Sequence, residues 1–178
     1  MTIITIDSKK NEKFLRKKTK SVDLARLKEL NLPALVRDMK VMMRRADGVG
    51  LSANQIGLDM KLFVAEVPAE RAHGTTKFYA ILNPEIVKRG GELVELEEGC
   101  LSVPGVFGPV DRTDRITVSG FDLKGRRLKI KAWGFLARVF QHEIDHLNGI
   151  LFVDKAKNLH DIPLSERLRA REAHGKQK

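Results

Sequence analysis

The sequence predicts an α+β fold. Two observations lead to this class: helical patterns stand before and after a central block of strand-like segments, and no regular alternation of one strand with one helix runs along the chain. A block order of this kind is typical of α+β proteins, whereas alternation is typical of a parallel sheet. With 178 residues and no repeat, low-complexity tract or linker, residues 1–178 are expected to form one domain with a sizeable core.

The first helical region is expected after Ser21 or Asp23, because either side chain can cap a helix. Its second part covers residues 34–48, where Pro33 begins or kinks the helix and Gly48 ends it. Apolar side chains recur in this part at helical spacing and are expected in the core: Leu35, Met39, Met42 and Ala46.

A glycine-punctuated loop is expected next, over residues 48–57. Segments with the composition of strands follow it, rich in β-branched and aromatic residues or alternating between apolar and polar ones. They cover residues 61–67, 78–87, 91–99, 115–122 and 126–132.

A second clear helix is expected from Gly134 to Asn148, with Gly149 as its C-terminal stop. Steps of four and three residues place two neighbouring inward stripes on it. One stripe contains Phe135, Val139, His142 and His146, and the other Leu136, Phe140, Glu143 and Leu147. The opposite side is expected to be polar, with Arg138, Gln141, Asp145 and Asn148. A last helix is expected near the C-terminus, over residues 164–173.

The two histidines of the second helix, His142 and His146, lie on one face, where neutral imidazoles can share a divalent metal ion. Glu143, also directed inward, fits the role of a general base for a metal-activated water. An ordinary helix with two buried, hydrogen-bonded histidines is the alternative, but burying these polar groups in an apolar stripe without a metal is costly.

A third protein ligand is needed, because a catalytic metal site has three protein ligands and one open position. Cys100 is the single cysteine of the chain, and two histidines with one cysteine form an allowed set for a borderline-soft divalent ion. A lone cysteine is more often a small buried hydrophobic residue, but the histidine motif in the same chain reverses that preference. One cysteine also excludes an intrachain disulfide and gives no sign of an oxidising compartment.

The net charge of the chain is +10, with basic clusters near the start, at residues 124–131 and in the tail after Asp154. Such a surface favours polyanions, of which RNA is the commonest in a cytosol. Solvated lysine faces on an enzyme of high pI are the simpler interpretation, because no aromatic RNA-binding signature accompanies the charge. The sequence has neither the apolar core of a signal peptide nor the apolar run of a membrane span, so we expect a cytoplasmic protein that binds neither membrane nor DNA.

Three stretches of the chain resemble the motifs of peptide deformylases, in the order in which that family has them. Residues 48–55 (GVGLSANQ) are similar to its glycine-rich first motif, residues 98–102 (EGCLS) to its second and residues 141–146 (QHEIDH) to its third. The enzymes of this family remove the formyl group from the N-terminus of nascent polypeptides. The resemblance covers nearly the whole chain, and it implies antiparallel sheets packed around a central metal-binding helix, in agreement with the predicted α+β class.

Carried over residue by residue, the resemblance implies that Cys100, His142 and His146 are the metal ligands and that Glu143 is the general acid and base. The family resemblance also implies Fe²⁺ as the ion in cells, replaceable by Ni²⁺, Co²⁺ or Zn²⁺. The ligand set itself does not choose between iron and zinc.

The resemblance also implies residues that contact the substrate. Gln55 and the backbone N–H of Leu101 would stabilise the oxyanion, while Val49 and Gly50 would line a groove in which the peptide pairs as an added strand. An apolar pocket would take the methionine side chain that follows the formyl group. Its wall is assigned from helical spacing alone, to Phe135 and Val139.

One departure from the family pattern is Ser52, which stands where the first motif usually has alanine. Because a small residue is retained, the loop is expected to close as usual, and the detail of the pocket is expected to change rather than the reaction. Asp145 lies within the third motif but on the side of the helix expected to be polar, so it is assigned a structural role.

Other functions remain open at this point. A zinc peptidase with the same H-E-x-x-H motif would take its third ligand downstream, from Asp154, His160, Asp161 or Glu166. An RNA or ribosome binder would use the basic patches and hold a structural metal, although an open site with a general base argues against it. A deformylase could also use its basic tail to stay near emerging chains on the ribosome. A relative of the family with a changed substrate is the last alternative.

Overall fold

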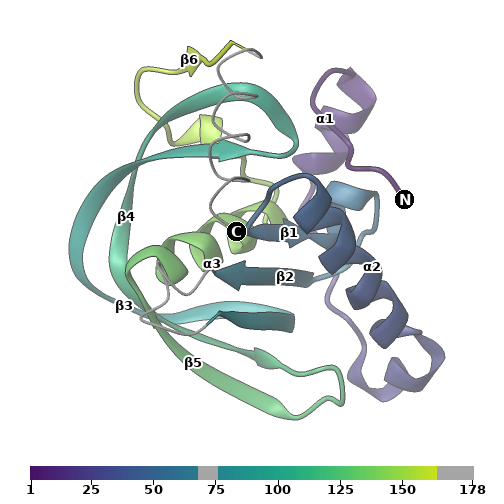
Figure 1. Ribbon diagram of the computed structural model, residues 1–178. Helices are drawn as coiled ribbons and strands as arrows, with labels where there is room; N and C mark the ends of the chain where they lie inside the picture. Colours follow the sequence, from purple (N-terminus) through teal and green to yellow (C-terminus); the bar gives the residue numbers. More distant parts are fainter. Residues whose placement is uncertain (68–75, 164–178) are drawn as a thin grey trace.

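The computed structural model describes residues 1–67 and 76–163, and it has the expected α+β architecture (Figure 1). The helices in these ranges are α1 (Lys9–Leu15), α2 (Leu32–Arg45) and α3 (Gly134–Leu147), with the short 3-10 helices η1 (Leu24–Glu29), η2 (Ala53–Ile56) and η4 (Phe152–Asp154). The strands are β1 (Gly50–Ser52), β2 (Leu62–Val67), β3 (Lys77–Cys100), β4 (Val103–Phe121), β5 (Arg127–Trp133) and β6 (His160–Asp161). None of the helices in the described ranges is long and apolar enough to cross a membrane.

The strands pair in one antiparallel sheet with the order β1-β2-β3-β4-β5, and β6 pairs with β4. β3 and β4 form a long hairpin that curves around α3 (Figure 1). Their register shifts between Leu82 and Glu85 and again between Gly90 and Leu93. Irregularities of this kind bend a strand and increase its twist, so the hairpin can wrap the helix instead of passing it as a flat ribbon.

α3 lies at the centre of the fold, where it contacts β1, β2, β4 and β5 (Figure 1). Its buried apolar residues pack in one cluster with the strands, and Phe140 lies edge-on to Phe63 and Tyr79, at ring distances of 5.3 and 5.1 Å. Complete burial of a side chain of this size contributes roughly 1.5 to 3 kcal/mol. Packing therefore fixes α3 firmly against the sheet.

Both ends of α3 agree with the sequence prediction. The helix begins at Gly134, and Asn148 caps its C-terminus. Gly149 has φ 78°, and a Cβ there would lie 2.2 Å from the carbonyl oxygen of Arg16. Only glycine satisfies both the positive φ and this close approach, so the chain turns sharply at the predicted stop.

α2 covers the other side of β1 and β2, but its buried stripe differs in phase from the predicted one. Asp23, one of the two predicted caps, accepts a hydrogen bond from the backbone of Ala25 and begins η1, while Pro33 occupies the first turn of α2. Met39 is buried as expected. The other buried positions are Leu32, Val36 and Met43, whereas Leu35, Met42 and Ala46 are half-buried. Leu35 and Met42 pack against the same apolar cluster, so they lie at the edge of the buried stripe.

The strands predicted at 61–67 and 126–132 agree with β2 and β5 to within one residue, whereas the other strand predictions were wrong in extent. The segments predicted at 78–87 and 91–99 belong to one continuous strand, β3. The segment predicted at 115–122 is the second half of β4, whose first half contains Pro104, Gly105 and Pro109 and has no strand signal. The segment predicted as a loop over residues 48–57 contains β1 and η2. The sequence has no signal for β1, because this strand is buried on both faces and its residues do not alternate between apolar and polar.

The polar side of α3, predicted opposite the inward stripes, is itself largely buried in the structure, which the sequence did not indicate. Arg138, Gln141 and Asp145 are only 5%, 3% and 8% exposed, and Asn148 alone of the four residues faces solvent. The hairpin of β3 and β4 covers this side and supplies the partners for its polar groups. The helix predicted at 164–173 lies outside the described residues.

Candidate metal centre

The three predicted metal ligands come together in the structure. His142 and His146 project from successive turns of α3, with ring centroids 4.9 Å apart. Cys100 is the last residue of β3, and its Sγ lies 3.1 Å from Nε2 of His146. The three donor atoms lie within 4.8 Å of one another, and they form the one cluster of this kind in residues 1–67 and 76–163. Pairing of β3 with β4 thus brings the cysteine to the central helix.

The electrostatics of this cluster suit a metal ion. Burial raises the pKa of the Cys100 thiol, but the two nearby imidazoles outweigh burial and bring the pKa well below its ordinary value. The thiolate is the form that binds metal. Burial lowers the pKa of His142, but hydrogen bonds with Cys100 and Glu98 raise it to about 10. A divalent cation between these donors would take the place of the protons that the imidazoles otherwise share with sulfur.

Glu98 orients His142 from behind. Its Oε2 lies 3.0 Å from Nδ1 of the imidazole, and because a carboxylate can only accept, Nδ1–H donates and Nε2 is left for the metal. Burial raises the pKa of Glu98, but hydrogen bonds from His142 and Arg112 outweigh it, and the pKa lies far below the ordinary value. The carboxylate is therefore ionised throughout the physiological pH range.

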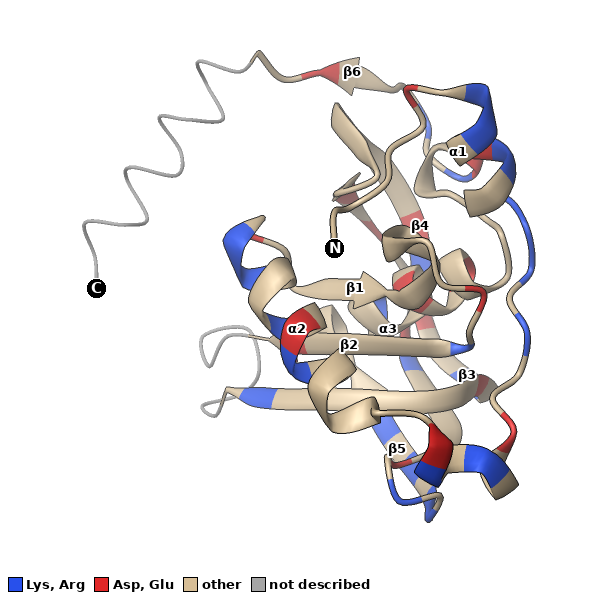
Figure 2. Ribbon diagram, turned by 90° about the vertical axis from the view of Figure 1, so that its right-hand side faces the viewer, with Lys and Arg blue, Asp and Glu red and all other residues tan. Residues whose placement is uncertain are grey.

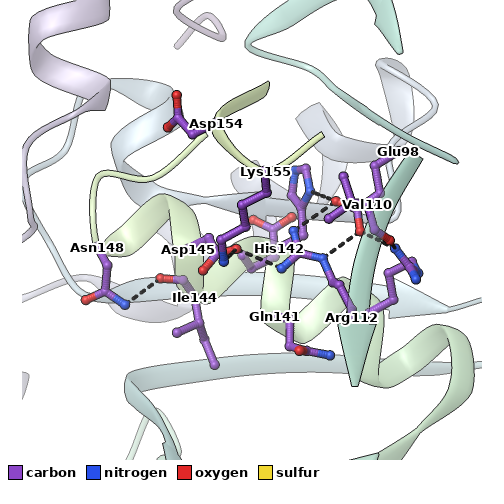
Figure 3. Close-up of polar contacts among 12 residues, drawn as sticks. Glu98, Val110, Arg112, Gln141, His142, Ile144, Asp145, Asn148, Asp154 and Lys155 are labelled. Carbon is purple, nitrogen blue, oxygen red and sulfur yellow. Dashed lines mark hydrogen bonds and ion pairs between the residues drawn. The ribbon is translucent and has the colours of Figure 1, made fainter. Parts of the chain in front are cut away.

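The buried arginines on either side hold Glu98 in place. Arg112 donates to both carboxylate oxygens, at 2.6 and 2.9 Å, and Arg138 donates to Oε1 at 2.7 Å. Arg112 also bridges to Asp145 at 2.7 Å, and Lys155 reaches the same Asp145 oxygen at 2.6 Å (Figure 3). Asp145 thus lies in an ion-pair network, which agrees with the structural role assigned to it.

Glu143, the predicted base, lies beside the ligand cluster and is 3% exposed. Burial raises its pKa above the ordinary value, although the charges of His142 and His146 oppose this effect. The hydroxyl of Ser52 lies 2.6 Å from Oε2, and the other oxygen, Oε1, lies close over Gly50. A Cβ on Gly50 would be 2.2 Å from Oε1, so glycine allows β1 to approach the carboxylate.

The two residues predicted to stabilise an oxyanion lie on either side of Cys100. Nε2 of Gln55 is 3.6 Å from Sγ of Cys100 and 3.1 Å from Oγ of Ser102, while its Oε1 accepts the backbone N–H of Ser52 at 2.8 Å. This last bond directs the amide nitrogen toward the cluster. Leu101 follows Cys100 in the turn between β3 and β4 and is half-buried.

The predicted substrate-binding residues also gather near α3. Val49, Phe135 and Val139 belong to the same apolar cluster as the core of α3, and Gly50 begins β1 beside Glu143. The structure therefore brings together an apolar cluster, a strand edge and the ligand cluster.

The alternative third ligands within the described residues lie outside the cluster of Cys100, His142 and His146. Asp154 pairs with Arg16 at 2.9 Å. His160 and Asp161 form the strand β6, and Nε2 of His160 lies 3.2 Å from Oε2 of Glu97. None of these three joins a group that could hold a metal within the described residues. Glu166 lies outside the described residues.

Sequence reasoning missed Glu98, Arg112 and Arg138. A signal for Glu98 exists, because it precedes Cys100 by two residues in a strand and so projects from the same face. Arg112 and Arg138 have no such signal, since their partner Glu98 is 14 and 40 residues away in the sequence.

The chain is similar to known proteins over most of its length. The family model described as polypeptide deformylase matches residues 3–161. A peptide deformylase of Chloroflexus aurantiacus is 42% identical over 167 residues, which cover 88% of this chain and 87% of that protein. The crystal structure of the Thermotoga maritima peptide deformylase superposes with a TM-score of 0.76 at 36% identity and covers 87% of this chain and 96% of that one. A peptide deformylase of Synechococcus elongatus, in complex with actinonin, gives a TM-score of 0.78 at 35% identity and covers 99% and 85%.

Proposed function

The chain belongs to the polypeptide deformylase family, whose members remove the N-terminal formyl group from nascent polypeptides, and from this premise we propose how its residues carry out that hydrolysis. The observation that carries the proposal is the meeting of Cys100, His142 and His146 around one point, with the buried Glu143 beside them. Three protein ligands and a neighbouring base form a catalytic rather than a structural site, because structural sites use four protein ligands.

Cys100, His142 and His146 would hold one divalent ion, and Glu98 would keep His142 oriented toward it. When bound, such an ion supplies Lewis acidity that makes hydroxide available near neutral pH and polarises a carbonyl oxygen. We propose Fe²⁺ as the ion, on the ground of the family resemblance. A thiolate with two imidazoles is also compatible with Ni²⁺, Co²⁺ and Zn²⁺. The thiolate cancels one of the two positive charges, which neutral imidazoles cannot do.

Glu143 would take a proton from the attacking water and deliver it to the amine nitrogen when the bond between that nitrogen and the formyl carbon breaks. The products are formate and a free N-terminus. Gln55 Nε2 and the N–H of Leu101 would donate to the oxyanion of the tetrahedral intermediate. Loss of one such donor typically costs about 10² to 10³ in kcat.

The peptide substrate would pair alongside β1. This strand stands at one end of the sheet order, so one of its edges pairs with no other strand in the described residues. An extended peptide can add there as a further strand, past Val49 and Gly50. The apolar side chains of Phe135 and Val139 lie in the same cluster as Val49 and would form the wall of the methionine pocket.

We propose that residues 1–178 act as one catalytic domain in the cytoplasm and that basic surfaces hold it near the ribosome. Lys and Arg gather on α1 and on β5 (Figure 2), and the net charge is +10. Truncation after Pro163 would remove the part of the basic tail that follows residue 163 and keep the ion pair between Lys155 and Asp145. Co-sedimentation with ribosomes at low salt is expected to weaken in the truncated protein, and unchanged co-sedimentation would exclude the tail as the contact.

Formate release from formyl-Met-Ala-Ser by protein purified without oxygen tests the reaction. The matched control is acetyl-Met-Ala-Ser, whose additional methyl group is expected to clash with the walls around the carbonyl carbon. We expect rapid release of formate and no release of acetate. Cleavage of internal peptide bonds without formate release would instead favour a peptidase of the H-E-x-x-H type.

A further inference from the structure

The carboxylate of Glu143 has one hydrogen-bond donor among the described residues, the hydroxyl of Ser52. The distance from Ser52 Oγ to Glu143 Oε2 is 2.6 Å, and Ser52 itself is completely buried. A short bond to a carboxylate is stronger than one between neutral groups, particularly where water is excluded. This contact therefore restricts the rotation of the Glu143 side chain more than any other polar contact in the described part of the chain.

The backbone of Glu143 is also within reach of the same hydroxyl, since Ser52 Oγ lies 3.0 Å from the Glu143 carbonyl oxygen. A serine hydroxyl has a single hydrogen, and the shorter distance and the negative charge favour the carboxylate as its acceptor. Both acceptors belong to one residue. Ser52 thus ties β1 to the turn of α3 that carries the base.

β1 lies close to both oxygens of the carboxylate. Gly50 and Ser52 are two residues apart and project from the same face of the strand. Glu143 Oε1 lies so close over Gly50 that a Cβ there would be 2.2 Å away, while Oε2 meets the Ser52 hydroxyl. The close contact at Gly50 leaves little room for Oε1, and the hydrogen bond from Ser52 holds Oε2.

Ser52 contacts both the base, Glu143, and the residue proposed to stabilise the oxyanion, Gln55. Its backbone N–H donates to Gln55 Oε1 at 2.8 Å, which directs Nε2 of Gln55 toward Cys100. This backbone bond is available to any residue at position 52. The hydroxyl contact with Glu143 requires a side-chain donor, and so it depends on serine.

We propose that Ser52 is a positioning residue for the reaction, whose hydroxyl holds the Glu143 carboxylate in the orientation for proton transfer. This inference rests on the proposed function, because it assigns a task within the same site. Replacement of Ser52 by alanine removes one buried oxygen and leaves the backbone bond to Gln55 in place. The carboxylate can then rotate, and a smaller fraction of molecules is ready to react.

The test is a double-mutant cycle between position 52 and position 143 with formyl-Met-Ala-Ser as substrate. Ser52→Ala is expected to lower kcat about tenfold with KM within about twofold of wild type, as for a lost hydrogen bond to a charged group. In the Glu143→Gln background the same change is expected to alter the residual kcat by less than about twofold, because the hydroxyl acts through the carboxylate. Metal content, measured on each sample, is expected to stay constant across the cycle.

One structural and one kinetic measurement complete the test. Crystal structures of wild type and Ser52→Ala without substrate are expected to differ in the side-chain torsion angles of Glu143. Ser52→Thr, which keeps the hydroxyl, is expected to retain most of kcat. An unchanged kcat in Ser52→Ala, or an equal loss in both backgrounds, would overturn the proposal. Absence of formate release from metal-loaded wild type would instead contradict the proposed function.

Discussion

Gly50→Ala tests whether the close approach of β1 to the base matters for the reaction. A Cβ built on Gly50 would lie 2.2 Å from Oε1 of Glu143, 2.8 Å from its Cδ and 3.0 Å from its Cγ. The carboxylate would have to move by about 1 Å to reach ordinary van der Waals contact. A misplacement of this size can cost about 10² in rate, or about 2.7 kcal/mol of barrier.

The effect on folding is expected to be much smaller than the effect on the reaction. The overlapping atoms belong to the end of a side chain, which can rotate away, and φ of Gly50 is not in the left-handed region. The free energy of unfolding is expected to change by at most about 1 kcal/mol. Alanine lowers the conformational entropy of the unfolded chain, and this stabilisation partly offsets the cost of displacing the carboxylate. Activity should therefore fall while the fold persists.

The assay is steady-state formate release together with urea denaturation of both proteins. Gly90→Ala is the matched control, since Gly90 lies in β3 with no atom within 4 Å of the added Cβ. We expect kcat of Gly50→Ala to fall about 100-fold and that of Gly90→Ala to stay unchanged. A Gly50→Ala enzyme with the wild-type kcat would refute the reasoning, because Glu143 would then tolerate displacement.

Three further changes test the ligand set, its support and the pH dependence of stability. Cys100→Asp keeps the negative charge but loses the soft sulfur ligand, so metal binding is expected to weaken and kcat/KM to fall at least about 100-fold. Unchanged metal preference and activity would contradict the assignment of Cys100 as a metal ligand. Glu98→Gln is expected to weaken metal affinity by about 10-fold to 100-fold in competition with a chelator, and equal affinity would exclude Glu98 as the support of His142. Hydrogen bonds from Arg44 hold the pKa of Glu66 below its ordinary value of 4.5, so its carboxylate stabilises the fold above that pH and the stability is lost as the pH falls through the folded pKa. Glu66→Gln is therefore expected to lower the free energy of unfolding by about 1 kcal/mol near neutral pH. At a pH below the folded pKa of Glu66, the variant and wild type are expected to be equally stable. A difference in stability that does not depend on pH would show that the ionised carboxylate is not its cause.

The sequence predicted α3 well because its signals are local. The apolar spacing, the histidines four residues apart and the stop at Gly149 all lie within one short segment, and the helix bounds agree with the prediction. The burial of the opposite, polar side of the same helix was not predicted. A polar residue can be buried when a distant partner satisfies it, and the partners of Arg138 and Asp145 come from the β3–β4 hairpin.

The strands show the same limit. The first half of β4 contains prolines and glycines that locally favour a loop, yet pairing with β3 makes it extended. β1 is too short and too fully buried to alternate. Strand pairing joins residues far apart in the chain, so local patterns located the sheet but could not give the length of the hairpin or the place of β1 beside Glu143.

The sequence predicted that Cys100, His142 and His146 come together, but it did not predict the residues that support them. Cys100 was chosen from chemistry, and the structure places it 3.1 Å from His146. The contact between Ser52 and Glu143 spans 91 residues of sequence, and nothing near Ser52 indicates its partner. The resemblance marked Ser52 only as a departure, and the structure shows what its hydroxyl contacts.

The central claim is that one cluster holds the metal while Glu143 moves the proton. Glu143→Ala, compared with wild type for formate release from formyl-Met-Ala-Ser and for metal content on the same samples, tests it most directly. The account predicts that the variant keeps the divalent ion at the wild-type level and that kcat falls by about 10² to 10⁴. A variant that keeps both metal and turnover would contradict the account, because proton transfer would then not need Glu143.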